Sequence, residues 1–177
     1  MKIHRSLEHS LRQPVCASTE GVRLVAALVC LLVGALIYVL ARPTPAWFLP
    51  VALHTPQEVG NNWQFLVGSA PTFLHVVAFS LLTAIVQGGG RMTAALSCVG
   101  WTSVNLLFEL GQHPLASQVL TRHIPIGLDQ FWLLDRVRPF FEHGSFDPND
   151  LCAALLGGAF AYVISRQFQP ESNDEKR

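Results

Sequence analysis

The chain has 177 residues, of which 50% are hydrophobic and 14% are charged, and its formal net charge is zero. Soluble domains carry about 25% charged residues, so this composition favours a membrane protein, and the zero net charge gives no indication of nucleic-acid binding. The seven histidines and four cysteines show no HExxH, CxxC or zinc-finger spacing, so the sequence predicts no metal site and no cofactor.

An uncharged apolar run over residues 24–41 follows a polar, basic segment over residues 1–23. At 1.5 Å per residue the run gives a helix of about 27 Å, close to the thickness of the hydrocarbon core. A signal peptide is the alternative, but its apolar core has about 7–15 residues and ends at a small-residue site. This run is longer and leads into Arg42-Pro43. We therefore predict a cytoplasmic N-terminal segment and a first membrane span.

Three further spans are predicted over residues 70–87, 92–110 and 148–165, where long apolar runs return. Ser69 is a suitable cap for the second helix, and Pro71 suits its first turn. The second and third spans are separated by a glycine-rich break, which predicts a tight turn.

The segment over residues 113–146 mixes charged and aromatic residues, which is typical of short amphipathic helices lying in the membrane interface. Residues 167–177 are polar and are predicted to form a cytoplasmic tail. The predicted fold is therefore all-α: a four-helix transmembrane bundle over residues 24–166, with an amphipathic interfacial segment between spans three and four.

The basic residues predict the orientation of this bundle, because cytoplasmic segments carry an excess of Lys and Arg. The side of the N-terminus holds Lys2, Arg5, Arg12, Arg23, Arg91, Arg166, Lys176 and Arg177, and the other side holds Arg42, Arg122, Arg136 and Arg138. We expect a multi-pass protein of the cell inner membrane with both termini in the cytoplasm.

Glu109 stands near the end of the third predicted span. A carboxylate at the middle of such a helix costs on the order of 2.5–3.5 kcal/mol, and even near its end it requires a partner or a wet cavity. Trp101, Asn105 and Gln112 share one helical face with Glu109. This polar face is predicted to point into the bundle rather than at lipid.

Polar residues of other spans are expected at a similar depth. Measured from the inner ends, His75, Asn105, Asp150 and Glu109 lie at about 18, 21, 24 and 27 Å. A polar pocket in the outer half of the membrane is therefore predicted from His75, Asn105, Glu109, Gln112, Asp147 and Asp150. Structural roles compete with this hypothesis: helix packing for His75, an interfacial helix end for Glu109 and Gln112, and an N-terminal capping box for Asp147 and Asp150.

Three segments resemble the VanZ-like family of small bacterial membrane proteins: FLHVVAFSLLTAIV at residues 73–86, LLFELGQ at 106–112 and GSFDPNDLCAALLGGAFAYVI at 144–164. Each family motif has counterparts in this chain. The family's His matches His75, and its Glu and Gln match Glu109 and Gln112. Its Phe-Asp pair matches Phe146 and Asp147, and the Asp and Gly that follow match Asp150 and Gly157. Two residues of the family motif are missing from this chain. Gly144 or Ser145 occupies the position of the family's Arg, and Ala154 occupies that of its Asn. The resemblance implies a cell-envelope role.

Three functions remain open from the sequence. The first is binding of an amphiphilic or lipid-linked ligand, or a partner, in the outer-leaflet pocket, with Arg136 or Arg138 as a cation in place of the missing Arg. The second is an intramembrane enzyme in which Glu109 and His75 form an acid–base pair acting on a lipid-linked envelope substrate. The third is a proton-coupled transporter. The sequence leaves open whether a reaction is catalysed and which oligomer forms.

Overall fold

A computed structural model of the chain describes residues 13–40, 61–123 and 137–168. The all-α prediction is confirmed for this part of the chain, which contains six helices and no strand. The helices are α2 (Gln13–Leu40), α3 (Asn61–Val86), α4 (Arg91–Gly111), α5 (Pro114–His123), α6 (Val137–His143) and α7 (Pro148–Gln167). Most of the predicted N-terminal segment, the connection after the first span, Arg136 and most of the predicted tail lie outside the described residues.

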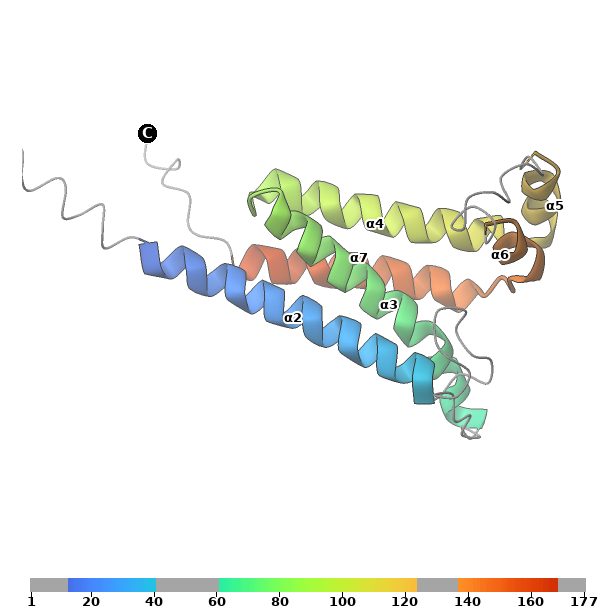
Figure 1. Ribbon diagram of the computed structural model, residues 1–177, viewed down its shortest axis with the longest axis horizontal. Helices are drawn as coiled ribbons and strands as arrows, with labels where there is room; N and C mark the ends of the chain where they lie inside the picture. The colour runs from blue at the N-terminus through green and yellow to red at the C-terminus, as the bar shows by residue number, and fades with distance from the viewer. Residues whose placement is uncertain (1–12, 41–60, 124–136, 169–177) are drawn as a thin grey trace, which may run out of the picture.

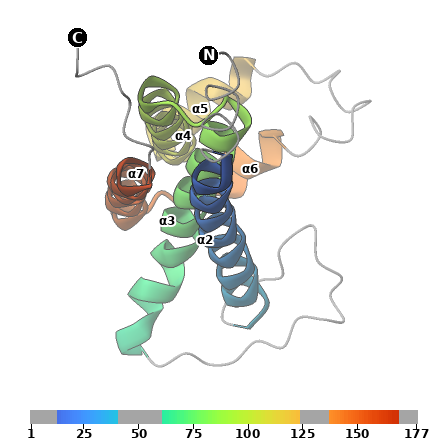
Figure 2. The same cartoon turned by 90° about the vertical axis from the view of Figure 1, so that its left-hand side faces the viewer.

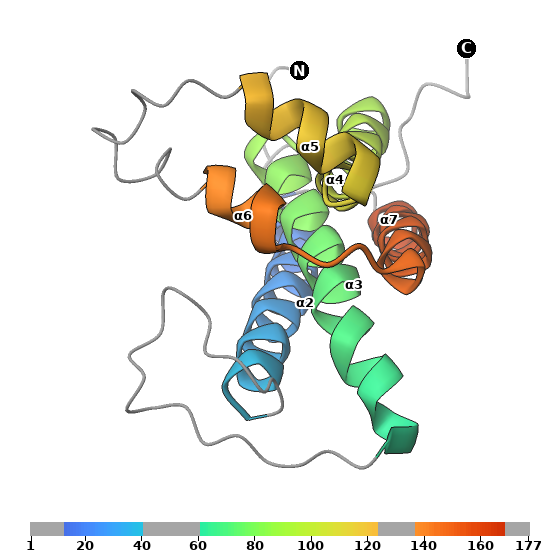
Figure 3. The same ribbon diagram turned by 90° about the vertical axis from the view of Figure 1, so that its right-hand side faces the viewer.

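The four long helices run side by side and alternate in direction, and α5 and α6 lie across one end of the bundle (Figures 1 and 3). Helix α3 is central, because it packs against α2, α4 and α7, and α4 also packs against α7. The start of α2, the turn between α3 and α4 and the end of α7 share the other end of the bundle, at the left of Figure 1.

The predicted helix limits agree with the structure better for the last two long helices than for the first two. Helices α4 and α7 begin within a residue of the predicted spans. Helix α2 begins at residue 13 rather than 24, and α3 begins at residue 61 rather than 70, so that Pro71 lies inside the helix and Ser69 does not cap it. Hydrophobic runs mark where a helix meets an apolar environment, whereas backbone hydrogen bonds continue into polar sequence.

The turn between α3 and α4 depends on two glycines. Gly88 and Gly89 have φ values of +89° and +69°, which glycine adopts without steric cost. The Gly88 amide donates to the Ile85 carbonyl, and the Gly89 amide donates to the Ala84 carbonyl. This pair of bonds is the Schellman arrangement that ends many helices, so the predicted tight turn is confirmed.

The bundle has small residues inside and large apolar residues outside. Much of its buried core consists of alanine, serine, glycine and cysteine, including Ala27, Ala78, Ala84, Ala94, Ser80, Cys98, Ala154 and Ala161. Large apolar side chains are exposed along three of the long helices, including Leu28 and Leu32 on α2, Leu96 and Val99 on α4, and Leu156 and Phe160 on α7. Soluble proteins place such residues mostly inside and rarely expose large apolar patches.

Two helices are long and apolar enough to cross a membrane by length and composition, over Thr19–Ile37 within α2 and Val67–Val86 within α3. Close helix packing accompanies the small interior residues. A Cβ atom built on Gly157 would lie 2.8 Å from the backbone oxygen of Phe73, so the backbones of α7 and α3 meet where the glycine has no side chain. Small residues at helix interfaces allow this close approach in membranes.

The predicted segment between the third and fourth spans contains two short helices, α5 and α6, joined by residues outside the described part. Phe141 of α6 fills the space above Gly111, where an added Cβ would lie 2.5 Å from the Phe141 ring. Phe140 and Phe141 both pack on Phe108 of α4, with ring centroids 5.5 and 6.1 Å away. Aromatic contacts therefore fix α6 to the end of α4 (Figure 3).

Candidate functional site

Glu109, in the last turn of α4, joins this helix to the beginning of α7. Its Oε1 atom accepts a hydrogen bond of 2.5 Å from the backbone amide of Asp147. Asp147 is the N-terminal capping residue of α7, and its Oδ1 atom accepts a bond of 2.9 Å from the Asn149 amide. The predicted capping role of Asp147 is confirmed, and Pro148 follows at the first helical position as expected.

The capping-box role considered for Asp150 is filled by Glu109 instead. In a capping box, the side chain at the third helical position accepts a bond from the amide of the capping residue. Here the Asp147 amide donates to Glu109, which comes from a different helix. Residues 38 positions apart in the chain therefore complete a motif that is normally local.

Three acidic residues stand at this junction. Glu109 accepts the Asp147 amide, and Asp147 and Asp150 stand at the cap and in the first turn of α7. Asp150 is in the first turn of α7, where the helix dipole stabilises a negative charge. The structure thus brings Glu109 to the start of α7, where the sequence placed Asp147 and Asp150.

Gln112 lies beside this carboxylate cluster. A Cβ atom built on Gly144 would lie 2.6 Å from Gln112 Cδ and 2.5 Å from the Phe140 carbonyl oxygen. The Gln112 side chain therefore packs directly on the backbone leading to Asp147. The same distances show that position 144 has no space for an arginine, so a side chain like the one the family carries there does not fit.

Asn105 and Trp101 extend the polar face of α4 toward the other end of the bundle. The Asn105 side-chain amide donates to the Trp101 carbonyl at 2.9 Å, within α4. The Trp101 indole N–H donates to Thr83 Oγ1 of α3 at 2.8 Å. The predicted inward direction of this face is therefore seen at Trp101, while the side-chain amide of Asn105 bonds within its own helix.

His75 has described contacts in a different direction from the carboxylate cluster. Its ring stacks on Phe79 with centroids 5.9 Å apart, and Phe79 stacks on Trp101 at 4.8 Å. On the side of α2, a Cβ built on Gly34 would lie 3.8 Å from His75 Nε2. Since Trp101 is level with Phe79, helix rise places Glu109 about 6 Å further along the bundle than His75.

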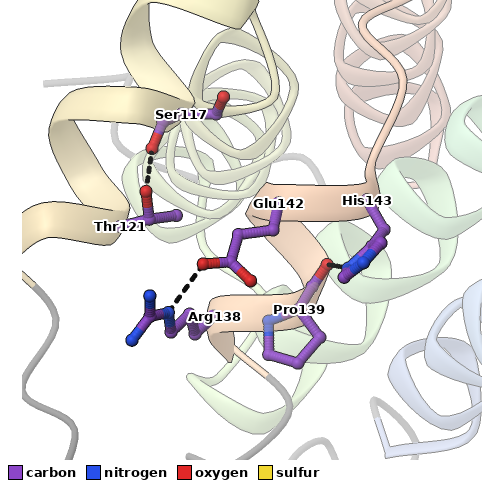
Figure 4. Close-up of polar contacts among 6 residues, drawn as sticks. All are labelled: Ser117, Thr121, Arg138, Pro139, Glu142 and His143. Atoms are coloured by element: carbon purple, nitrogen blue, oxygen red, sulfur yellow. Dashed lines mark hydrogen bonds and ion pairs between the residues drawn. The ribbon is translucent and has the colours of Figure 1, made fainter.

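Two arginines, Arg138 and Arg136, were considered as cationic partners of Glu109. Arg138 Nε pairs with Glu142 Oε1 at 2.6 Å, one turn along α6 (Figure 4), and Arg136 lies outside the described residues. Among the described residues, no cationic side chain forms an ion pair with Glu109. Within the same ranges, no group of three or more His, Cys, Asp or Glu residues has an arrangement that holds a metal ion.

The chain was compared with models of protein families, with curated proteins and with solved structures, and none of these comparisons gave a match. The resemblance to the VanZ-like family therefore stays a prediction from its motifs. The site is interpreted below from its own chemistry.

One residue that the sequence did not single out is Arg23. It was counted with the basic N-terminal segment, but its side chain is 1% exposed and bonds to two other parts of the bundle. Its position directly before an uncharged run of 18 residues is the signal that would have indicated a buried cation.

Proposed function

We propose that the chain is a VanZ-like, four-span protein of the bacterial inner membrane that binds an amphiphile at the outer end of its bundle. The observation that carries the membrane location is the reversed distribution of side-chain size. Alanine, glycine and serine make up most of the interior, beside Val76, Val77 and Leu81 of α3, and leucine, valine and phenylalanine face outward on α2, α4 and α7. In lipid, small residues allow close helix packing and outward apolar residues carry no cost.

Both termini lie in the cytoplasm in this proposal. The four long helices of the described residues alternate in direction, and the bundle end that holds the start of α2 also holds Arg91 and Arg166. The excess of basic residues on that side supports the orientation. The junction of α4 with α7 then lies near the outer surface, at the end of the bundle that carries α5 and α6 (Figure 1).

The carboxylate cluster supports a ligand whose polar head is an ammonium group. Glu109 and the capping residue Asp147 bring two acidic side chains to this junction, and no described cation pairs with Glu109. A carboxylate has about four lone-pair sites, so the bond from the Asp147 amide leaves Glu109 able to accept others. The outward apolar faces of α4 and α7 beside it suit the acyl chains of the same ligand.

The acid–base hypothesis is less well supported than binding. An acid and a base that act together need to lie within hydrogen-bond reach of the reacting group. Helix rise places His75 about 6 Å from Glu109 along the bundle axis. Binding of an amphiphile uses only the groups that the junction brings together.

The test uses full-length protein in vesicles containing a trace of photoactivatable phosphatidylethanolamine, whose head carries an ammonium group, or of phosphatidylglycerol, whose head does not. We expect the first lipid to label the ends of α4 and α7 more strongly than the second. Glu109→Gln is expected to reduce this labelling, since it removes the charge and keeps an acceptor.

Glu142→Gln is the matched control, because Glu142 lies on α6 at the same end and pairs with Arg138. It should leave labelling unchanged when both variants accumulate normally. Equal labelling by the two lipids, or an equal reduction in the two variants, would refute an ammonium-binding role for Glu109.

A further inference from the structure

Arg23 is the largest fully buried side chain of the described residues, and it connects three parts of the bundle. Its Nη2 atom donates to the carbonyl of Ser165 at 2.9 Å and to that of Phe168 at 2.7 Å. Its Nη1 atom donates to the Gly89 carbonyl at 3.4 Å. These carbonyls belong to the end of α7 and to the turn that follows α3.

The position of the guanidinium is electrostatically favourable. The last carbonyls of a helix have no donor within the helix, and the helix dipole makes this end negative. A guanidinium offers five N–H donors in a planar fork, so one side chain serves both the end of α7 and the turn that follows α3. A Cβ on Gly89 would lie 3.2 Å from Nη1, so the glycine also leaves space for Arg23.

Arg23 matters because α2 is the peripheral helix of the bundle. Helices α3, α4 and α7 all pack against one another, whereas the main packing partner of α2 is α3 (Figure 2). Arg23 reaches past α3 to α7. Next to the Arg23 guanidinium, the Ser165 side chain is fully buried, although Ser165 belongs to the last turn of α7.

We propose that Arg23 is a latch that fixes α2 onto the unit formed by α3, α4 and α7 and closes this end of the bundle. A closed end here means that ligands reach the interior only from the opposite end, where Glu109 lies. It also leaves no path through both ends, as a transporter requires. The latch does not depend on what the Glu109 end binds.

The test measures how fast a water-soluble maleimide labels a thiol introduced by Ser165→Cys. The full-length protein is used in permeabilised membrane vesicles, with its four native cysteines replaced by alanine. We expect slow labelling with Arg23 present and labelling at least about tenfold faster with Arg23→Gln, since hydrogen bonds to a charged group are each worth about this factor or more. Arg23→Lys should be intermediate.

Arg166→Gln is the control, because Arg166 is an exposed arginine at the same end of α7. It should not change the labelling rate. The latch would be refuted if Arg23→Gln left the thiol protected, or if Arg166→Gln accelerated labelling to the same extent.

A second measurement applies if Arg23→Gln does not accumulate. A Cβ on Gly34 would lie 3.8 Å from the Leu74 Cβ, which is within the range for a disulfide. The pair Gly34→Cys and Leu74→Cys would then hold α2 on α3 covalently. We expect this disulfide to restore the accumulation of Arg23→Gln, and failure to restore it would show that Arg23 does not act by docking α2.

Discussion

Leu156→Lys tests whether α7 crosses a membrane, which its length and composition alone do not indicate. Leu156 lies near the middle of α7, and its side chain is 64% exposed. In a soluble protein, an exposed position of this kind tolerates lysine with a change in stability within about 0.5 kcal/mol. In a membrane, the same position faces hydrocarbon.

The expected cost in a membrane follows from insertion free energies. Leucine contributes about −0.3 to −0.6 kcal/mol at the centre of a span, and lysine costs about 2.5–3.5 kcal/mol. The substitution therefore costs about 3–4 kcal/mol, which corresponds to more than about a hundredfold in the insertion equilibrium. The predicted free-energy cost of Leu156→Lys is therefore severalfold larger if α7 crosses a membrane than if the protein is soluble.

The assay reads the location of the C-terminus, because the loss of one span moves it to the other side. A reporter fused to the C-terminus that is active only in the cytoplasm should be active in the wild type. In Leu156→Lys, we expect activity to fall while a reporter active only in the periplasm gains it, as α7 fails to insert.

Leu115→Lys is the matched control, because it makes the same substitution at a more exposed residue of α5, at the end of the bundle. Lysine is tolerated near the membrane surface, so this variant should keep the wild-type reporter pattern. If Leu156→Lys also kept that pattern, or if the wild type remained dispersed in buffer without detergent, the membrane interpretation would be wrong.

Two further predictions concern the stability of the bundle, measured as thermal unfolding of detergent-purified protein. Gly157→Ala should cost about 1–3 kcal/mol because its Cβ meets the backbone oxygen of Phe73, whereas Gly100→Ala, with nothing within 4 Å, should be neutral or stabilising by up to about 1 kcal/mol. A similar loss in both would argue against tight packing of α3 on α7. Asp147→Ala should cost about 1 kcal/mol by removing the cap of α7, and Asp147→Asn should retain most of it because asparagine also caps helices. An equal loss in both aspartate variants would mean that charge rather than capping matters.

The sequence predicted those features that depend on neighbours along the chain. The apolar runs located all four long helices, the glycine pair located the turn after α3, and the order Asp147-Pro148 located the start of α7. Pro71 misled the prediction for α3, because proline is favoured at a helix start but is also tolerated inside a buried helix.

The candidate site was predicted in part. Helix rise indicated that Glu109 and Asp150 would lie at a similar depth, and Glu109 does bond to the start of α7, where Asp150 lies in the first turn. The same depth argument grouped His75 with them, and this part stays a prediction; the contacts of His75 include Phe79 and the region of Gly34. Depth gives a position along the helix axis and says nothing about the rotation of one helix relative to another.

By itself, the sequence determined an all-helical chain with a polar face on α4 and a capped start for α7, since these follow from local hydrogen bonding and the helical repeat. Only the tertiary structure decided that Glu109 accepts the Asp147 amide and that Arg23 joins the turn after α3 to the end of α7. Both bonds join groups far apart in the chain, so their formation depends on the packing and register of separate helices, which no local pattern of residues specifies.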